Sequence, residues 1–169
     1  MRRLRARQPG DDHPVDLVTH IGSVTLPNPV MTASGTAGHG DELGRYVDLS
    51  GVGALVVKSL GAEPWAGNPP PRVHETAAGM INSVGLAGPG VAAWREDELP
   101  ALRAAGARVV ASIWGRTVEQ YEQAARLLAG AEGVLAVEVN LSCPNLGGGH
   151  SMFAHDPGAT AEVLEATAA

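Results

Sequence analysis

The only cysteine of the chain stands between two asparagines, in a loop that follows an apolar segment. Residues 134–139 predict a buried strand, and Asn140, Cys143 and Asn145 come directly after it. In a parallel α/β fold, ligands bind at the loops that follow the C-terminal ends of strands. A thiol between carboxamides, which both donate and accept hydrogen bonds, suits a base acting on a flat, amide-rich ring. A buried structural cysteine in a turn is the alternative, and the motif alone leaves both open.

Two earlier apolar segments end in residues that could also face a ligand. Residues 30–33 predict a strand that runs into a turn of small residues at 34–38, and residues 53–57 predict a strand followed by Lys58 and Ser59. Small residues let a planar cofactor approach the backbone, although an ordinary glycine-rich turn has the same composition. Lys58 either binds an anion or a developing negative charge, or extends its ammonium group into solvent.

The elements that must position these residues can be predicted from periodicity and from proline, glycine and cap residues. Pro100 is expected to interrupt one helix, Thr117 and Gln120 to form a capping box, and Asp156 to cap the last helix with Pro157 at its first position. The predicted strands cover 30–33, 53–57, 108–113 and 134–139, and hairpins are predicted over 17–26 and 73–82. Helices are predicted over 41–49, over 91–105, after Thr117, and at the C-terminus through Val163 and Leu164. The first of these helices would have Leu43, Val47 and Tyr46 on one side, and the helix after Thr117 would bury Val118, Tyr121, Ala125 and Leu128.

Four strands that alternate with helices or loops, each apolar enough to be buried on both faces, predict a parallel sheet of βα units. The candidate residues follow the first, second and fourth strands, so they would share one rim of a β/α barrel. Asn82, in the long excursion at 61–90, is a further candidate, because a loop of this length inside a domain is usually functional.

Composition narrows the function classes. The chain of 169 residues carries a net charge of −6, which argues against general nucleic-acid binding, and no apolar run is long enough to cross a bilayer. A single cysteine excludes an internal disulfide and fits a reducing, cytoplasmic environment. The histidines show no metal-ligand spacing, so no metal site is predicted. Residues 1–14, which contain four arginines, predict a disordered basic tail before an ordered part at 15–169, with a weak anionic contact as the alternative.

Several motifs together resemble one family, the class 1 dihydroorotate dehydrogenases, which are FMN-dependent (β/α)8 TIM barrels. The resemblance covers about residues 15–169 and the first four strands with their helices, a half barrel preceded by an N-terminal β-hairpin. The matching segments, in the order and spacing of the family, are Asn28-Pro29-Val30-Met31-Thr32-Ala33-Ser34-Gly35, Val56-Val57-Lys58-Ser59, Gly67-Asn68-Pro69-Pro70-Pro71-Arg72, Asn82-Ser83-Val84-Gly85-Leu86 and Asn140-Leu141-Ser142-Cys143-Pro144-Asn145.

The resemblance implies a role for each matched residue. Cys143 is the expected base that removes the C5 proton of dihydroorotate, at a position where class 2 enzymes carry serine, and the C6 hydride is expected to pass to the flavin. Lys58 and Asn140 are expected to contact both substrate and FMN. The other expected substrate contacts are Asn82, Ser83, Val84, Gly85, Leu86 and Asn145, and the other expected FMN contacts are Ala33, Ser34, Gly35 and Ser59.

The segment at 148–157 is closer to the class 1B pattern than to 1A. Class 1B catalytic subunits commonly work with a subunit that carries FAD and an iron–sulfur cluster and passes electrons to NAD, so such a partner is expected, as is a homodimer of the full-length form. His150, in the same segment, is a weaker candidate as a helper of the base than as a solvated loop residue.

Two features depart from the family. The loop at 146–150 lacks the lysine that often precedes its paired glycines, and it is either a lid over the substrate or a flexible turn. A complete barrel needs about 250 residues, so we expect a truncated chain that binds FMN poorly by itself. The alternatives are a related flavin enzyme that reduces dihydropyrimidines, which Asn145 disfavours because that family carries histidine there, and a half barrel without activity.

Overall fold

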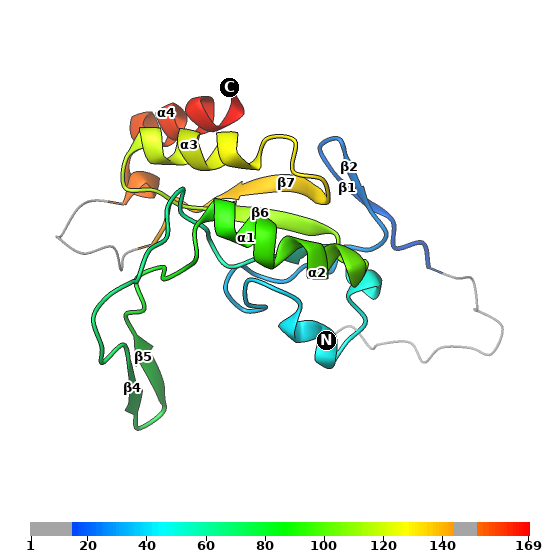
Figure 1. The fold of residues 1–169 in the computed structure, drawn as a ribbon, viewed down its shortest axis with the longest axis horizontal. Coiled ribbons are helices and arrows are strands. Elements are labelled where there is room, and N and C mark those ends of the chain that lie inside the picture. The colour runs from blue at the N-terminus through cyan, green and yellow to red at the C-terminus, as the bar shows by residue number, and fades with distance from the viewer. Residues whose placement is uncertain (1–14, 144–151) are drawn as a thin grey trace, which may run out of the picture.

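A small parallel β-sheet is the centre of the molecule in the computed structural model, which describes residues 15–143 and 152–169 (Figure 1). The sheet has the order β3-β6-β7, formed by β3 (Leu55–Val56), β6 (Val109–Ile113) and β7 (Val134–Val139). Both strand pairs are parallel, as the alternation of strands and helices predicts. The described strands form an open sheet and not a closed barrel.

Successive residues of β6 point to opposite faces of the sheet, and each face has its own core. Val109, Ala111 and Ile113 belong to the larger core, which the helices cover. Val110 lies on the other face, where it joins a small cluster with Val56 and Leu26 of the N-terminal hairpin. All five residues of β6 are buried, so the prediction of a doubly covered strand is confirmed here.

The first predicted strand, at 30–33, is reduced to one parallel bridge between Met31 and Ala54, beside β3. Its position in the sheet is the predicted one, but the ladder stops at Thr32. The hydroxyl of this threonine accepts from the main-chain N–H of Val56 at 2.8 Å and donates to its carbonyl at 3.2 Å. A side chain therefore occupies the main-chain groups that the next ladder bonds would need.

The prediction of one helix over 41–49 is wrong. Two short 3₁₀ turns, η1 (Glu42–Arg45) and η2 (Leu49–Gly51), take its place. Of the side chains expected on its buried side, Tyr46 is 84% and Val47 is 45% exposed. Asp48 accepts hydrogen bonds from both the N–H and the hydroxyl of Ser50, and such local side-chain bonds compete with a continuous helix.

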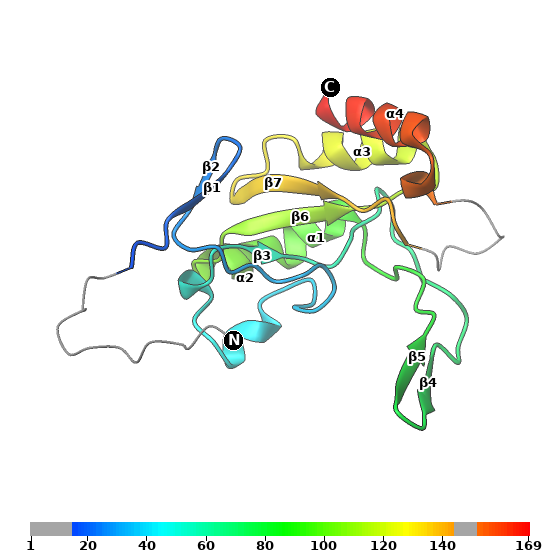
Figure 2. The ribbon, with the colours of Figure 1, turned by 180° about the vertical axis from the view of Figure 1, so that it is seen from behind.

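Both predicted hairpins are confirmed. The first pairs β1 (Thr19–Ile21) with β2 (Val24–Leu26), and the second pairs β4 (Val73–Thr76) with β5 (Gly79–Asn82). Seen from behind, the first hairpin lies at one end of the sheet, whereas the second projects away from the body of the protein (Figure 2). All eight residues of β4 and β5 are exposed.

The helix predicted over 91–105 is interrupted as expected. It consists of α1 (Val91–Asp97) and α2 (Leu99–Ala104), with Pro100 in the first turn of α2. Proline has no N–H to lose there and cannot continue the preceding helix, which explains the break.

Two further helices cover the same face of the sheet. Thr117 is the N-cap residue of α3 (Val118–Leu128), but the capping box is wrong, because the Gln120 side chain accepts from Arg116 N–H at 2.7 Å. Of the predicted stripe, Tyr121 and Leu128 are buried, and Val118 and Ala125 are partly buried. The last helix, α4 (Pro157–Ala168), follows the short turn η3 (Phe153–His155) and is capped by Asp156 as predicted.

The prediction that every strand is buried on both faces is wrong for β7. It is the edge strand of the described sheet, and Leu135 and Val137 are 42% and 37% exposed. An edge strand lacks the neighbour that would cover these side chains.

Candidate functional site

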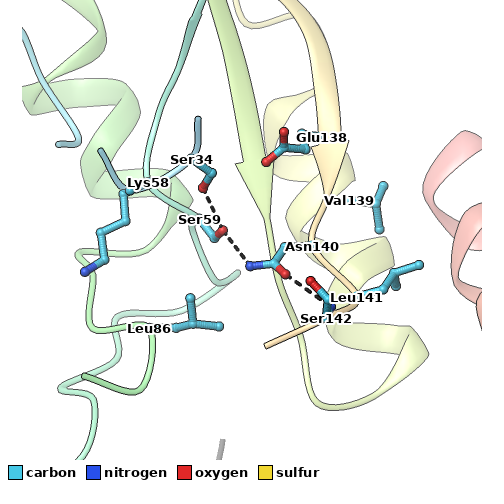
Figure 3. A pocket seen from close by; sticks show the side chains of 10 residues that line it. Ser34, Lys58, Ser59, Leu86, Glu138, Val139, Asn140, Leu141 and Ser142 are labelled. Carbon is cyan, nitrogen blue, oxygen red and sulfur yellow. Dashed lines mark hydrogen bonds between the residues drawn. The ribbon is translucent and has the colours of Figure 1, made fainter. Parts of the chain in front are cut away.

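A pocket of about 540 Å³ lies where the C-terminal ends of the parallel strands meet (Figure 3). Loops that follow the parallel strands contribute to it, which is the rim at which β/α folds bind ligands. Its lining residues are Ser34, Gly35, Lys58, Ser59, Leu86, Glu138, Val139, Asn140, Leu141 and Ser142.

Ser59 is the centre of the polar wall of this pocket. Its hydroxyl oxygen lies 3.1 Å from Ser34 Oγ and 2.9 Å from Ser112 Oγ, and it accepts a hydrogen bond from Asn140 Nδ2 at 2.9 Å. Ser59 and Ser112 are both buried, with 1% and 0% of their surface exposed. The network therefore links the loops that follow the first parallel segment, β3 and β7, through one buried hydroxyl, that of Ser59.

The carboxamide of Asn140 has a fixed orientation. Its Nδ2 donates to Ser59, and its Oδ1 accepts from the main-chain N–H of Ser142 at 3.3 Å. Turning the amide by 180° would place two donors against each other at Ser142. The backbone of Asn140 is held as well, because its N–H donates to Ile113 at 2.9 Å and its carbonyl accepts from Tyr121 Oη at 2.7 Å.

Tyr121 supports this loop from α3, where it is 1% exposed and packs edge-on against Phe153. Burial raises the pKa of its phenol above the ordinary value of 10.0, with a smaller increase from Cys143 and an opposing effect of a hydrogen bond to Gly115. The phenol is therefore held in its protonated form, in which it donates to Asn140.

Lys58 stands across the pocket from Asn140 (Figure 3). Its main-chain N–H donates to the carbonyl of Gly38 at 2.9 Å, while its ammonium group forms no salt bridge with any residue in the described part of the chain. Beside it, burial and the charge of Lys58 lower the pKa of His39, and Glu42 partly opposes this change. An ammonium group without a carboxylate partner is available to an anionic ligand.

The segment predicted to contact substrate between Asn82 and Leu86 enters the pocket only at its end. Leu86, with a positive φ of 57°, lines the pocket. Ser83 and Gly85 are bonded elsewhere, to Asn68 Nδ2 and to Trp65 Nε1. Asn82, Ser83, Val84 and Gly85 are not among the lining residues, and neither is Ala33, so their contacts remain predictions.

Cys143 follows the last lining residue, Ser142, and is not itself part of the lining. Its thiol is free and half-buried. Its charge makes a small contribution to the raised pKa of Tyr121. Asn145 and His150, also predicted from the sequence, lie outside the described residues.

The structure adds residues that the sequence prediction missed. Glu138, Val139, Leu141 and Ser142 line the pocket, and Ser112 and Tyr121 support it from behind. Strand alternation is a signal for Glu138, since it is two residues before Asn140 and therefore on the same face. No comparable signal in the sequence pairs Ser112 with Ser59, which are 53 positions apart.

In the part of the chain that the structure describes, no helix is long and apolar enough to cross a membrane. The same residues contain no cluster of three or more histidine, cysteine or acidic side chains that could hold a metal ion.

The parallel βα arrangement, with a polar pocket at the C-terminal ends of its strands, is the arrangement with which α/β folds, β/α barrels among them, bind ligands. Comparison with family models is more specific, because the model described as dihydroorotate dehydrogenase matches residues 16–169. The chain belongs to the dihydroorotate dehydrogenase family, a family of flavoenzymes with a TIM-barrel fold.

Similar curated proteins carry the name dihydroorotate dehydrogenase B (NAD(+)), catalytic subunit. The protein of Desulforudis audaxviator is 51% identical over 144 residues, which are 85% of this chain and 47% of that protein. The protein of Alkaliphilus metalliredigens is 47% identical over 152 residues, 90% of this chain and 50% of that protein. The chain thus spans about half the length of the curated relatives it matches.

Proposed function

We propose that this chain forms the N-terminal half of a dihydroorotate dehydrogenase barrel, and that its pocket holds FMN beside dihydroorotate. One observation carries the proposal. Six of the residues predicted to contact cofactor or substrate line one pocket, although they come from segments far apart in the sequence: Ser34, Gly35, Lys58, Ser59, Leu86 and Asn140.

The pocket suits the flavin. Its volume of about 540 Å³ lies within the range of roughly 300 to 1,000 Å³ that is common for ligand sites. Gly35 has a φ of +83°, and a Cβ built there would enter open space, with only Lys58 Cγ as near as 4.0 Å. Hydroxyl, carboxamide and ammonium groups on the opposite walls match the carbonyl and imide groups of a flavin ring.

The chemistry follows from the residues around this space. The thiolate of Cys143 would take the proton from C5 of dihydroorotate, and bound FMN supplies the acceptor for the hydride leaving C6, so that a C5–C6 double bond remains. Lys58 would stabilise negative charge on the ring or carboxylate, because its ammonium group is unpaired among the described residues. Asn140 would orient the ring, since its amide is already fixed by Ser59 and Ser142.

The relatives also bear on the partners. They are named as catalytic subunits of an NAD(+)-dependent enzyme, which supports our proposal of an electron-transfer subunit with FAD and an iron–sulfur cluster. A class 1B assignment, a homodimer of the full-length form and a cytoplasmic location are parts of the same proposal. The half-barrel arrangement is supported by the share of the relatives that the chain spans.

The test is complementation. The chain is mixed or co-expressed with the part of the Desulforudis audaxviator protein that lies beyond the matched region, and FMN binding is followed by visible absorbance. We expect weak FMN binding by the chain alone and strong binding by the complemented pair. Absence of binding in both preparations would refute the proposal.

The second stage of the test addresses the base. Anaerobic addition of dihydroorotate should bleach the flavin band, and Cys143→Ala should slow this bleaching by about 10² to 10⁴, the usual contribution of a general base. FMN binding by the variant should be unchanged, and Cys143→Ser should be intermediate. Bleaching at the wild-type rate in Cys143→Ala would exclude Cys143 as the base while leaving FMN binding intact.

A further inference from the structure

Ser112 is a polar residue in the middle of a buried apolar strand, and it lies outside the pocket lining. It belongs to β6, in which the other residues are Val109, Val110, Ala111 and Ile113. No part of its surface is exposed, and its Oγ lies 2.9 Å from that of Ser59. A hydroxyl in such a place is costly unless its hydrogen bond is made, so its presence calls for a role.

The number of hydrogen bonds at Ser59 shows what this role is. A serine hydroxyl has one proton to donate and two lone pairs to accept with. Ser59 Oγ has three side-chain partners in the described part of the chain, Ser34, Ser112 and Asn140, and the amide nitrogen of Asn140 can only donate. One lone pair is thus taken by Asn140. The remaining lone pair and the proton must be divided between Ser34 and Ser112.

Ser112, the buried end of this row of hydrogen bonds, decides which hydroxyl donates to which. If Ser59 donated to Ser112, the proton of Ser112 would be left without an acceptor among the described residues, at a position that water does not reach. If Ser112 donates to Ser59, every buried proton has an acceptor. Ser59 then donates to Ser34, and the proton of Ser34 is free to turn into the pocket that this serine lines.

We propose that Ser112 is a positioning residue, which sets the hydroxyl of Ser59 and through it both the Asn140 amide and the donor at Ser34. The pocket then presents a hydroxyl donor at Ser34 to an acceptor atom, such as a carbonyl oxygen of a flat heterocycle. That this ligand is the flavin or the pyrimidine rests on the proposed function, whereas the hydrogen-bond direction does not.

The experiment reads the Asn140 amide without any ligand. In the ¹⁵N-labelled chain, the Asn140 side-chain signals are assigned by their loss in Asn140→Asp. Ser112→Ala and Ser112→Cys, which both remove the hydroxyl, should shift these signals and make their exchange with solvent about fivefold faster, the ratio expected for a hydrogen bond of ordinary net strength. Ser112→Thr, which keeps the hydroxyl, should restore the wild-type signals.

Ser50→Ala is the matched control, because it removes a serine hydroxyl that donates to Asp48 outside the pocket. It should leave the Asn140 signals unchanged. Unchanged signals in both hydroxyl-free variants, with the backbone spectrum showing that they are folded, would overturn the role of Ser112. If the complemented wild-type protein fails to bind FMN, the proposed function fails, but this ligand-free measurement still decides the role of Ser112.

Discussion

Replacing Tyr121 by phenylalanine removes a single hydroxyl that anchors the loop bearing the proposed base. This hydroxyl donates to the Asn140 carbonyl at 2.7 Å, and the residue is 1% exposed. A typical hydrogen bond contributes about 1 kcal/mol, and a buried acceptor left without a partner costs about 1 to 3 kcal/mol. The ring of phenylalanine keeps the packing against Phe153, so the loss is confined to the hydrogen bonds of the hydroxyl, of which the one to Asn140 is the anchor of the loop.

We therefore expect Tyr121→Phe to lower the free energy of unfolding by about 1.5 kcal/mol. For a chain of 169 residues, this corresponds to a fall of about 3 to 6 °C in the unfolding midpoint. Urea denaturation followed by the fluorescence of the three tryptophans measures it. Tyr46→Phe is the matched control, because Tyr46 is the other tyrosine of the chain and is 84% exposed.

A second signature of the same variant appears at alkaline pH. The pKa of Tyr121 is raised above 10.0 in the folded protein, so the folded state retains a proton that the unfolded state loses. The stabilisation from this group is complete below about pH 10 and declines as the pH rises above it. Tyr121→Phe should lose this alkaline decline. Equal stabilities of the Tyr121 and Tyr46 variants at neutral pH, with the same alkaline decline in both, would refute the reasoning.

Two further predictions concern groups near other parts of the fold. Burial and the nearby Lys58 lower the pKa of His39, and Glu42 partly opposes this change. The stabilisation from His39 is therefore complete above about pH 6.5 and is lost as the pH falls below that value. In denaturant titrations, His39→Gln should lose less stability than the wild type between about pH 7.5 and 5.5. Asp156 accepts from two main-chain N–H groups at the start of α4, so Asp156→Ala should cost about 1 kcal/mol, whereas Asp41→Ala should cost clearly less because its side chain makes no cap bond. An equal loss in these two aspartate variants would contradict the assignment of the cap.

Much of the fold could be predicted because local chemistry agrees with the tertiary structure. Asp156 and Pro157 together define the start of α4, and Pro100 defines the break between α1 and α2. The prediction of a helix over 41–49 was wrong because local bonds there favour another structure. The apolar spacing of this segment suggests a helix, but Asp48 has an extended backbone, and its side chain bonds to Ser50 and caps the start of a separate 3₁₀ turn, η2. A periodicity argument does not count such bonds.

Site residues that directly follow a strand could be predicted from the sequence. Those whose place depends on the pairing of strands or the packing of helices could not. Lys58, Ser59 and Asn140 come after strands and line the pocket together. Asn82 comes from an excursion, and position in the sequence does not fix where the end of a long excursion lies. Ser112 and Tyr121 act through contacts with residues that are distant in sequence, so only the register of the sheet and the packing of α3 bring them to the pocket.

An irregularity of β7 shows how the sheet register sets this chemistry. Val134 pairs with Val109 and Ala136 pairs with Val110, so Leu135 is an additional residue that forms a bulge. Because of this bulge, Val134 and Val137 both lie on the helix-covered face, although their separation of three positions would place them on opposite faces of a regular strand.

The residues after the bulge then alternate without interruption. Glu138, opposite Ser112, and Asn140, two positions later, lie on the face that the helices do not cover. Val137 and Val139 lie on the helix-covered face. A pattern with a period of two cannot indicate a bulge in advance, yet this one residue decides that Glu138 of β7, and Asn140 just after the strand, lie on the face of the serines and not on that of the helices. Sheet register, more than the identity of any one residue, is therefore what assembles the Ser59 network.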